Sequence, residues 1–190
     1  MLYLVTEGQS AYRIILPETA DATLNHAAQE LARYMARISG AILPIAGSGS
    51  PAADKEICLG VTGRPGEPDP SGLKNNGYRI ASAGDRLFIQ GDGSRGVLYG
   101  VYGLLEECLG CRFFAEGVEH IPCRATIELA PPSLTRVSPL EYRETLWHCM
   151  RGGDIASKRG FNGQNHQLAE NQGGNIRYFG FVHPFKQYVD

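Results

Sequence analysis

The stretch from Arg86 to Pro122 restricts the possible folds more than any other part of this sequence. It begins with three apolar residues, Leu87 to Ile89, which predict a buried strand, and a glycine-rich turn of sequence GDGSRG follows. Apolar residues then recur at three- and four-residue spacing, which predicts a helix with one buried face. These residues are Val97, Leu98, Val101, Leu104, Leu105 and Leu109. Gly110 stands where a left-handed helix cap is favoured, and the apolar run 111–114 predicts a second strand. The stretch therefore predicts a compact α/β unit.

The glycine turn has two interpretations. Gly91, Gly93 and Gly96 spell GxGxxG between a strand and a helix, which is the form of a dinucleotide-binding fingerprint. Glu116 falls near the position expected for a ribose-binding acid, but no series of βα units follows the motif. The alternative is a structural turn, in which glycine supplies positive φ and lets the helix pack closely on the sheet. Ser94 is expected to cap this helix by accepting a hydrogen bond from its first turn.

The remainder of residues 1–132 predicts one more helix and several short strands. The helix is expected from Asp21 or Thr23 to Gly40, because its apolar residues follow the helical period and Gly40 ends it. A β-hairpin is expected between Gly77 and Gly91. The order β-β-α-β-β-β-β-α-β indicates an α/β (α+β) fold, a mixed sheet with both helices packed on one face.

Composition excludes several classes of partner. The chain has 190 residues, of which 43% are hydrophobic and 20% charged, so it suits one domain or one domain and a fragment. A formal net charge of -2 gives no electrostatic reason to expect nucleic acid or an anionic membrane. No apolar run approaches the roughly 20 residues of a membrane span. Met1 is followed by no basic segment, so we expect no signal peptide in this chain, and its localisation is left unassigned.

The cysteines and histidines predict neither a metal site nor a redox centre. Five cysteines are an odd number, which disfavours a disulfide framework. Cys108 and Cys111 form a CxxC at the C-terminal end of the expected helix, where the helix dipole does not lower a thiol pKa. No second CxxC completes a zinc site, and His148, His166 and His183 are widely spaced. We therefore expect no metal and no cofactor.

The sequence changes character after Pro131-Pro132, where we place a domain boundary. Strands are expected at 140–146 and 176–182. Residues 151–175 between them are rich in glycine and amides and show little apolar periodicity, so they predict loosely ordered chain. Limited proteolysis is accordingly expected to leave a fragment that ends between Pro131 and Arg151.

Several short motifs resemble a known group of proteins. They are RG at 95–96, LYG at 98–100, LLE at 104–106, LGCRFF at 109–114, IP at 121–122 and LARYMARISGAILPI at 31–45. They resemble the N-terminal domain of large bacterial carbohydrate-active proteins, family 4838 of the domains of unknown function. The similarity extends, more distantly, to the non-catalytic N-terminal accessory domains of α-glucuronidases and β-hexosaminidases, whose relatives are often exported.

The resemblance covers most of the chain and implies a domain organisation. It implies an accessory α/β domain at residues 1–132 and a truncated beginning of a (β/α) barrel at 133–190. The partner it implies is the downstream catalytic barrel of the same polypeptide, with carbohydrate as a possible ligand. The expected function is a non-catalytic accessory domain of a glycoside-hydrolase-like protein.

Glycoside hydrolysis commonly requires two carboxylates that flank the scissile bond. The carboxylates beyond the boundary are Glu141, Glu144, Asp154 and Glu170. None of them is paired at a spacing that predicts two carboxyl groups across one site, so we expect no catalytic residue in this chain.

The resemblance also implies candidate substrate-binding residues. A first-strand arginine of such barrels, here Arg143, would hold sugar hydroxyls or a carboxylate, which suits its planar fork. A surface or interdomain salt bridge is the alternative for this residue. Asn162 and His166 lie in the glycine-rich stretch, and His183 follows an apolar run, so all three are candidate sugar contacts.

Two rival functions belong to other classes. A separate carbohydrate-binding module would need exposed aromatic side chains on one face, for which Tyr78, Tyr99 and Tyr102 are the candidates. A nucleotide-binding domain would use the GxGxxG turn. Exposure of these tyrosines on one face would favour the first rival, and binding of NAD, FAD or ATP in a calorimetric titration would favour the second.

Overall fold

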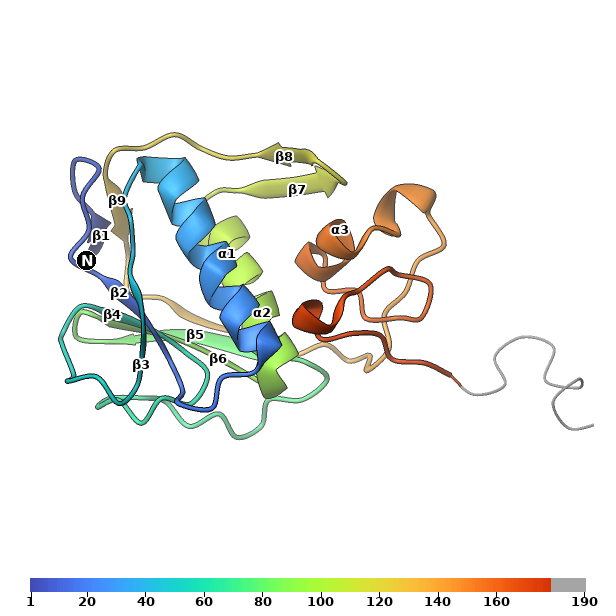
Figure 1. The fold of residues 1–190 in the computed structure, drawn as a ribbon, viewed down its shortest axis with the longest axis horizontal. Coiled ribbons are helices and arrows are strands. Elements are labelled where there is room, and N and C mark those ends of the chain that lie inside the picture. Colours follow the sequence, from blue (N-terminus) through green and yellow to red (C-terminus); the bar gives the residue numbers. More distant parts are fainter. Residues whose placement is uncertain (179–190) are drawn as a thin grey trace, which may run out of the picture.

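A six-stranded mixed sheet forms the centre of the protein (Figure 1). The structure, a computed structural model, describes residues 1–178. The strand order is β10-β5-β6-β4-β2-β3, in which β3, β2, β4 and β6 are parallel and β5 and β10 run antiparallel to their neighbours. The strands are β2 (Arg13–Leu16), β3 (Ile45–Gly47), β4 (Glu56–Leu59), β5 (Tyr78–Ala83), β6 (Arg86–Gly91) and β10 (Ser133–Arg136). The predicted mixed sheet is confirmed.

Two helices cover one face of this sheet, as predicted (Figure 1). They are α1 (Ala22–Ser39) and α2 (Gly93–Gly103), and α2 continues into a π-helical turn, Leu104–Cys108. Asp21 caps α1 by accepting a hydrogen bond from the Leu24 amide at 2.8 Å, and Gly40 ends it with a φ of 80°. Strand residues facing the helices join one continuous apolar core, because successive side chains of a strand point to opposite faces.

Two small two-stranded sheets complete the first part of the fold. β1 (Leu2–Val5) pairs with β9 (Ile127–Leu129), and β7 (Arg112–Ala115) forms a hairpin with β8 (Val118–His120). The β7 side chain of Phe113 meets the rings of Tyr34 and Tyr102 edge-on, with centroids 5.5 and 5.8 Å away. These aromatic contacts join the hairpin to both helices.

The glycine turn before α2 is built for close packing. A side chain at Gly91 would bring its Cβ to 2.1 Å from the Val97 nitrogen, and one at Gly96 would approach the Gly77 carbonyl oxygen to 2.7 Å. The prediction that Ser94 caps α2 is wrong, because Asp92 occupies the cap position and the Ser94 hydroxyl donates to Asp21 instead. The beginnings of α1 and α2 are thereby held side by side.

The chain after Pro132 differs from the sequence-based expectation. β10 extends the main sheet, no strand forms at 140–146, and α3 (Gly153–Lys158) lies within the stretch expected to be loosely ordered. Ile155 of α3 is buried in the main core. The sequence did not predict this helix, because α3 lacks the periodic apolar residues by which longer helices are recognised. Residues 176–178 form no strand, and the rest of the strand expected there lies outside the described residues. The division into domains 1–132 and 133–190 stays a prediction.

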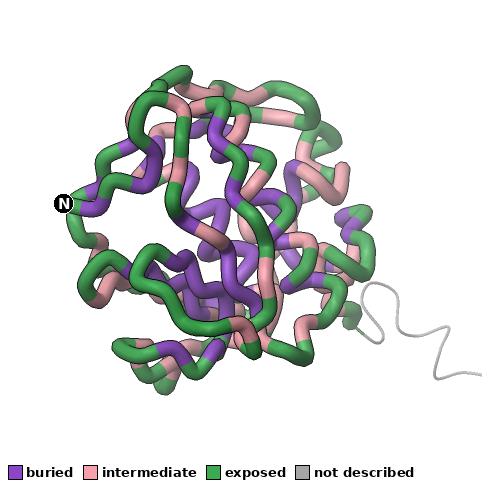
Figure 2. The backbone as a smooth tube through the Cα atoms, turned by 60° about the vertical axis from the view of Figure 1, so that its left-hand side comes forward, coloured by how far each residue is buried: buried purple, intermediate pink, exposed green. Residues whose placement is uncertain are grey.

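Burial is concentrated along the strands and helices, whereas the connecting loops are largely exposed (Figure 2). Among residues 1–178, no helix has the length and apolar character needed to cross a membrane. Trp147 is 71% exposed, so it does not serve as a core residue.

Candidate functional site

A pocket of about 320 Å³ lies where the sheet, α2 and the later segment of the chain meet. β5 contributes Tyr78, α2 contributes Tyr99, and the π-helical turn contributes Glu106 and Glu107. The part of the chain from 138 to 176, called the later segment below, supplies Ser138, Arg143, Lys158, Arg159 and Gly160. The pocket therefore combines aromatic rings and charged groups from two parts of the sequence.

The two carboxylates of the pocket are both engaged in ion pairs. Glu106 binds Arg159 at 2.8 Å and Glu107 binds Arg136 at 2.5 Å. Glu107 also accepts a hydrogen bond from the Tyr78 hydroxyl at 3.1 Å. Each carboxylate of the pocket is thus already paired with an arginine, whereas glycoside cleavage commonly requires two carboxylates that flank the scissile bond.

Arg143 is held in the pocket by main-chain oxygens. Its Nε donates to the Gly160 carbonyl at 2.7 Å, and its Nη1 donates to the carbonyls of Asn75 and Leu140 at 3.0 and 2.7 Å. The guanidinium carbon lies 5.6 Å from the centre of the Tyr99 ring. Within residues 1–178, Arg143 forms no ion pair with a carboxylate, and burial lowers its pKa. It remains charged at neutral pH, so a guanidinium without a directly paired carboxylate faces the pocket.

Asn162 and His166 support the segment that carries Arg143. The buried Asn162 side chain accepts a hydrogen bond from the Arg143 amide at 2.7 Å and donates to the Glu141 carbonyl at 2.7 Å. His166 Nδ1 lies 2.8 Å from the Met150 carbonyl oxygen, and its ring is stacked against another aromatic ring at 4.9 Å. Neither side chain lines the pocket.

The structure thus brings Arg143 and Asn162 into contact, whereas His183 lies outside the described residues. The substrate-binding role of all four candidates stays a prediction. Sequence reasoning missed Asn75 and Asn76, which contact the Arg143 segment. They end the stretch 61–76, whose three prolines and three glycines predict only a long loop.

The remaining carboxylates of the later segment do not form a catalytic pair. Glu144 accepts hydrogen bonds from the Tyr142 hydroxyl at 2.6 Å and from Asn165. Burial alone would raise the pKa of Glu144, but these bonds lower it, so the group stays ionised. Asp154 binds Lys158 at 2.6 Å, and Glu170 is exposed.

Both rival functions lose their structural basis. Tyr99 and Tyr102 are 6% and 1% exposed, so the tyrosines form no exposed aromatic face for stacking on sugars. At the glycine turn, Arg95 donates hydrogen bonds to the carbonyls of Gly173 and Gly174, so the chain's own later segment lies against the start of α2. A dinucleotide would need that position for its pyrophosphate.

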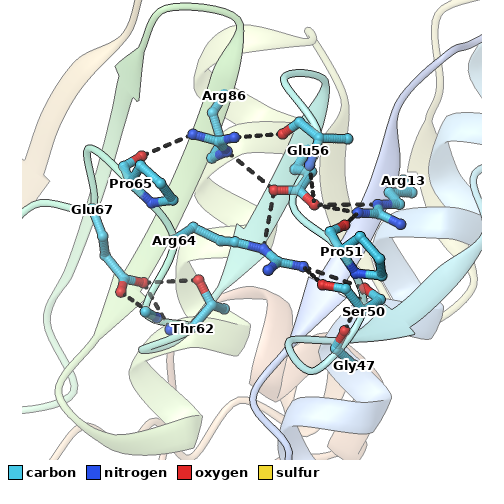
Figure 3. A network of polar contacts seen from close by, with 12 residues as sticks. Arg13, Gly47, Ser50, Pro51, Glu56, Thr62, Arg64, Pro65, Glu67 and Arg86 are labelled. Atoms are coloured by element: carbon cyan, nitrogen blue, oxygen red, sulfur yellow. Dashed lines mark hydrogen bonds and ion pairs between the residues drawn. The ribbon is translucent and has the colours of Figure 1, made fainter.

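A second polar cluster lies at the amino ends of the parallel strands, whereas the pocket lies beside the carboxyl end of β6 (Figure 3). Arg13, Glu56 and Arg86 are the first residues of the adjacent parallel strands β2, β4 and β6, so they lie side by side. The fully buried Glu56 carboxylate pairs with these two arginines and with Arg64 at 2.7 to 3.1 Å. Ligands of open α/β sheets bind at the carboxyl ends of parallel strands, so this cluster at their amino ends is structural.

The five cysteines all lie within the described residues and form no disulfide. All five thiols are free, and burial raises the pKa of Cys58 and Cys111 to about 11. A thiol with so high a pKa is unreactive at neutral pH. In the part of the chain that the structure describes, no three His, Cys, Asp or Glu side chains are grouped to hold a metal ion.

The structure is an α+β domain whose pocket carboxylates, within residues 1–178, are both paired with arginines. The model of the family described as "Glycosyl hydrolase family 67 N-terminus" matches residues 4–104, which is more than half of the chain. The chain belongs to this family of glycosyl hydrolase N-terminal domains.

A solved structure has a similar fold. It is described as "a novel family GH115 4-O-Methyl-alpha-glucuronidase, BtGH115A, with specificity for decorated arabinogalactans". The TM-score is 0.54 and the sequence identity 14%, over 75% of this chain and 19% of that chain. No curated protein matches the sequence. The chain thus corresponds to about a fifth of the similar protein's length.

Proposed function

We propose that this domain supports a catalytic (β/α) barrel that follows it in the same polypeptide. The family match over residues 4–104 carries the proposal, because that family is defined as the N-terminus of a glycosyl hydrolase. The similar α-glucuronidase structure agrees with it, since four fifths of that chain extends beyond the region of likeness. In this proposal the accessory domain buttresses the barrel and forms one wall of the sugar site.

The parent protein, on this proposal, is a member of family 4838 of the domains of unknown function. Its substrates would be glycans that carry α-linked uronic acids, because the matched family and the similar structure both belong to glycoside hydrolases and the latter is an α-glucuronidase by its description. Residues 133–190 would begin the barrel, and β10 would connect it to the accessory sheet.

Arg143 is the residue of this chain that we propose to contact the sugar. Its charge has no carboxylate partner within residues 1–178 and it faces a pocket, which suits recognition of a sugar carboxylate or hydroxyl group. Asn162 and His166 would act by holding the backbone on either side of it. His183 would be a further sugar contact.

The proposal is tested on the polypeptide encoded by the complete reading frame. We expect a barrel to be encoded after Asp190, and we expect Arg143→Ala to raise KM for aryl glucuronides while the protein stays folded by circular dichroism. Arg143→Lys keeps the charge but loses the planar fork, so it should recover only part of the affinity. A reading frame that encodes no barrel would contradict the proposal.

A further inference from the structure

Two adjacent asparagines hold an unusual backbone conformation beside the pocket. Asn75 and Asn76 have φ angles of 56° and 57°, in the left-handed region that residues with a Cβ avoid. Asparagine tolerates this region better than most residues, but two in succession form a strained corner. Such strain persists only where the surrounding structure fixes it, and it is frequent at sites with a special role.

The corner receives hydrogen bonds from both parts of the chain. The Asn76 Oδ1 atom accepts from Arg95 Nη1 of α2 at 3.3 Å and from Asn162 Nδ2 at 3.1 Å. The Asn75 carbonyl accepts from Arg143 Nη1 at 3.0 Å, and its side-chain Nδ2 donates to the Ser138 carbonyl at 2.9 Å. One short corner thus contacts α2 and three separate points of the later segment.

We propose that the Asn75–Asn76 corner is an anchor that holds the Arg143 part of the later segment, 138–176, beside the sheet and thereby positions Arg143, in addition to the core contact of Ile155 and the bonds from Arg95. The other main-chain oxygens that hold the Arg143 guanidinium, those of Leu140 and Gly160, belong to the later segment itself. The Asn75 carbonyl is therefore the acceptor that ties Arg143 to the first part of the fold.

A further hydrogen bond holds the backbone of the corner in its left-handed conformation. Asn76 also donates its amide to the Asp92 carboxylate at 3.2 Å, which fixes the corner to the start of α2. With its backbone fixed in this way, Asn76 presents its side-chain oxygen to the later segment while Asn75 presents its carbonyl. The two residues are positioning residues, and the role given to Arg143 rests on the proposed function.

Three variants of the full chain separate the side-chain oxygen from the backbone conformation. Asn76→Gly keeps the left-handed φ but removes the acceptor, whereas Asn76→Asp keeps an acceptor in the same place. Glu7→Gly is the matched control, because Glu7 also has a positive φ, of 50°, and its amide bonds to Thr126 far from the later segment.

Amide hydrogen exchange read by mass spectrometry measures the result without any sugar. We expect Asn76→Gly to exchange about fivefold faster in residues 138–176, because the hydrogen bond from Asn162 is lost, while α1 and β6 keep their protection. Asn76→Asp and Glu7→Gly should exchange like the unchanged protein in that segment.

Unchanged exchange in Asn76→Gly would overturn the anchor, and so would faster exchange spread evenly over the whole chain. The anchor would also be overturned if Asn76→Asp accelerated exchange in residues 138–176 as much as Asn76→Gly does. In that case the side-chain acceptor at position 76 would not be what holds the segment. The readout needs no ligand, so a failure of Arg143 to bind sugar would refute the proposed function and leave the anchor standing.

Discussion

Replacing Glu56 by glutamine tests how much the Glu56 carboxylate stabilises the fold by pairing with three arginines. The carboxylate is fully buried and binds Arg13, Arg64 and Arg86 (Figure 3). Glutamine has nearly the same shape but no charge, and its amide group would place a donor among guanidinium donors. The substitution therefore leaves buried positive charge without a counter-charge.

The expected loss is large for a single substitution. Removing one partner of a buried ion pair costs about 3–5 kcal/mol, because the remaining charge stays desolvated. Arg64 and Arg86 also donate hydrogen bonds to the main-chain oxygens of Ser50, Ala53 and Pro65, and these bonds remain in the variant. We therefore expect the loss of unfolding free energy to be near the lower end of this range, about 3 kcal/mol. At about 2–4 °C per kcal/mol for a chain of this size, the melting temperature should fall by about 6–12 °C.

Urea unfolding followed by circular dichroism measures the change. Glu107→Gln is the control, because the Glu107–Arg136 pair is exposed and should contribute no more than about 1 kcal/mol. Equal effects of the two substitutions, or a loss below about 1 kcal/mol for Glu56→Gln, would refute the reasoning.

The same cluster predicts a pH dependence. Burial alone would raise the pKa of Glu56, but its bonds to the arginines and to the Ala53 amide lower it below the ordinary 4.5. A carboxyl with a lowered folded-state pKa stabilises the protein fully above its unfolded pKa, and this contribution is lost as pH falls through the folded pKa. Glu56→Gln should therefore lose less stability on acidification below pH 4.5 than the unchanged protein does.

Three further predictions follow from the packing. Gly96→Val should reduce the yield of folded protein, measured by size-exclusion chromatography, because a Cβ there would lie 2.7 Å from the Gly77 carbonyl oxygen. Calorimetric titration should detect no binding of NAD, FAD or ATP, and micromolar affinity would contradict the structural role of the glycine turn. Limited proteolysis should leave a fragment that extends beyond Asn162, which is fully buried, and cleavage between Pro131 and Arg151 would favour the sequence-based expectation instead.

The sequence predicted the elements whose periodic patterns are long. The apolar stripe of α1 and the hairpin of β5 and β6 were both located correctly, because their side chains repeat with the period of the element. Gly110 was correctly expected to adopt a left-handed cap, and its φ is 83°. These features depend on local chain geometry, which neighbouring residues largely determine.

The candidate site was predicted less well because it depends on long-range contacts. α3 has only six residues, too few for an amphipathic period, and it is stabilised by Ile155 entering the main core. The Asn75–Asn76 corner meets partners nearly ninety positions away, as in the bond from Asn162. Ser94 was misassigned because its hydroxyl has a better acceptor in Asp21, on another helix.

The central claim, an accessory domain without glycosidase activity of its own, is tested most directly by an enzyme assay of residues 1–190. A panel of aryl glycosides and aryl glucuronides should be hydrolysed no faster than in the buffer blank, because the carboxylates of the pocket are held in ion pairs with arginines. Turnover above the blank that disappears in a glutamine variant of Glu106, Glu107, Glu144 or Glu170 would contradict the account, because it would place a catalytic carboxylate within this chain.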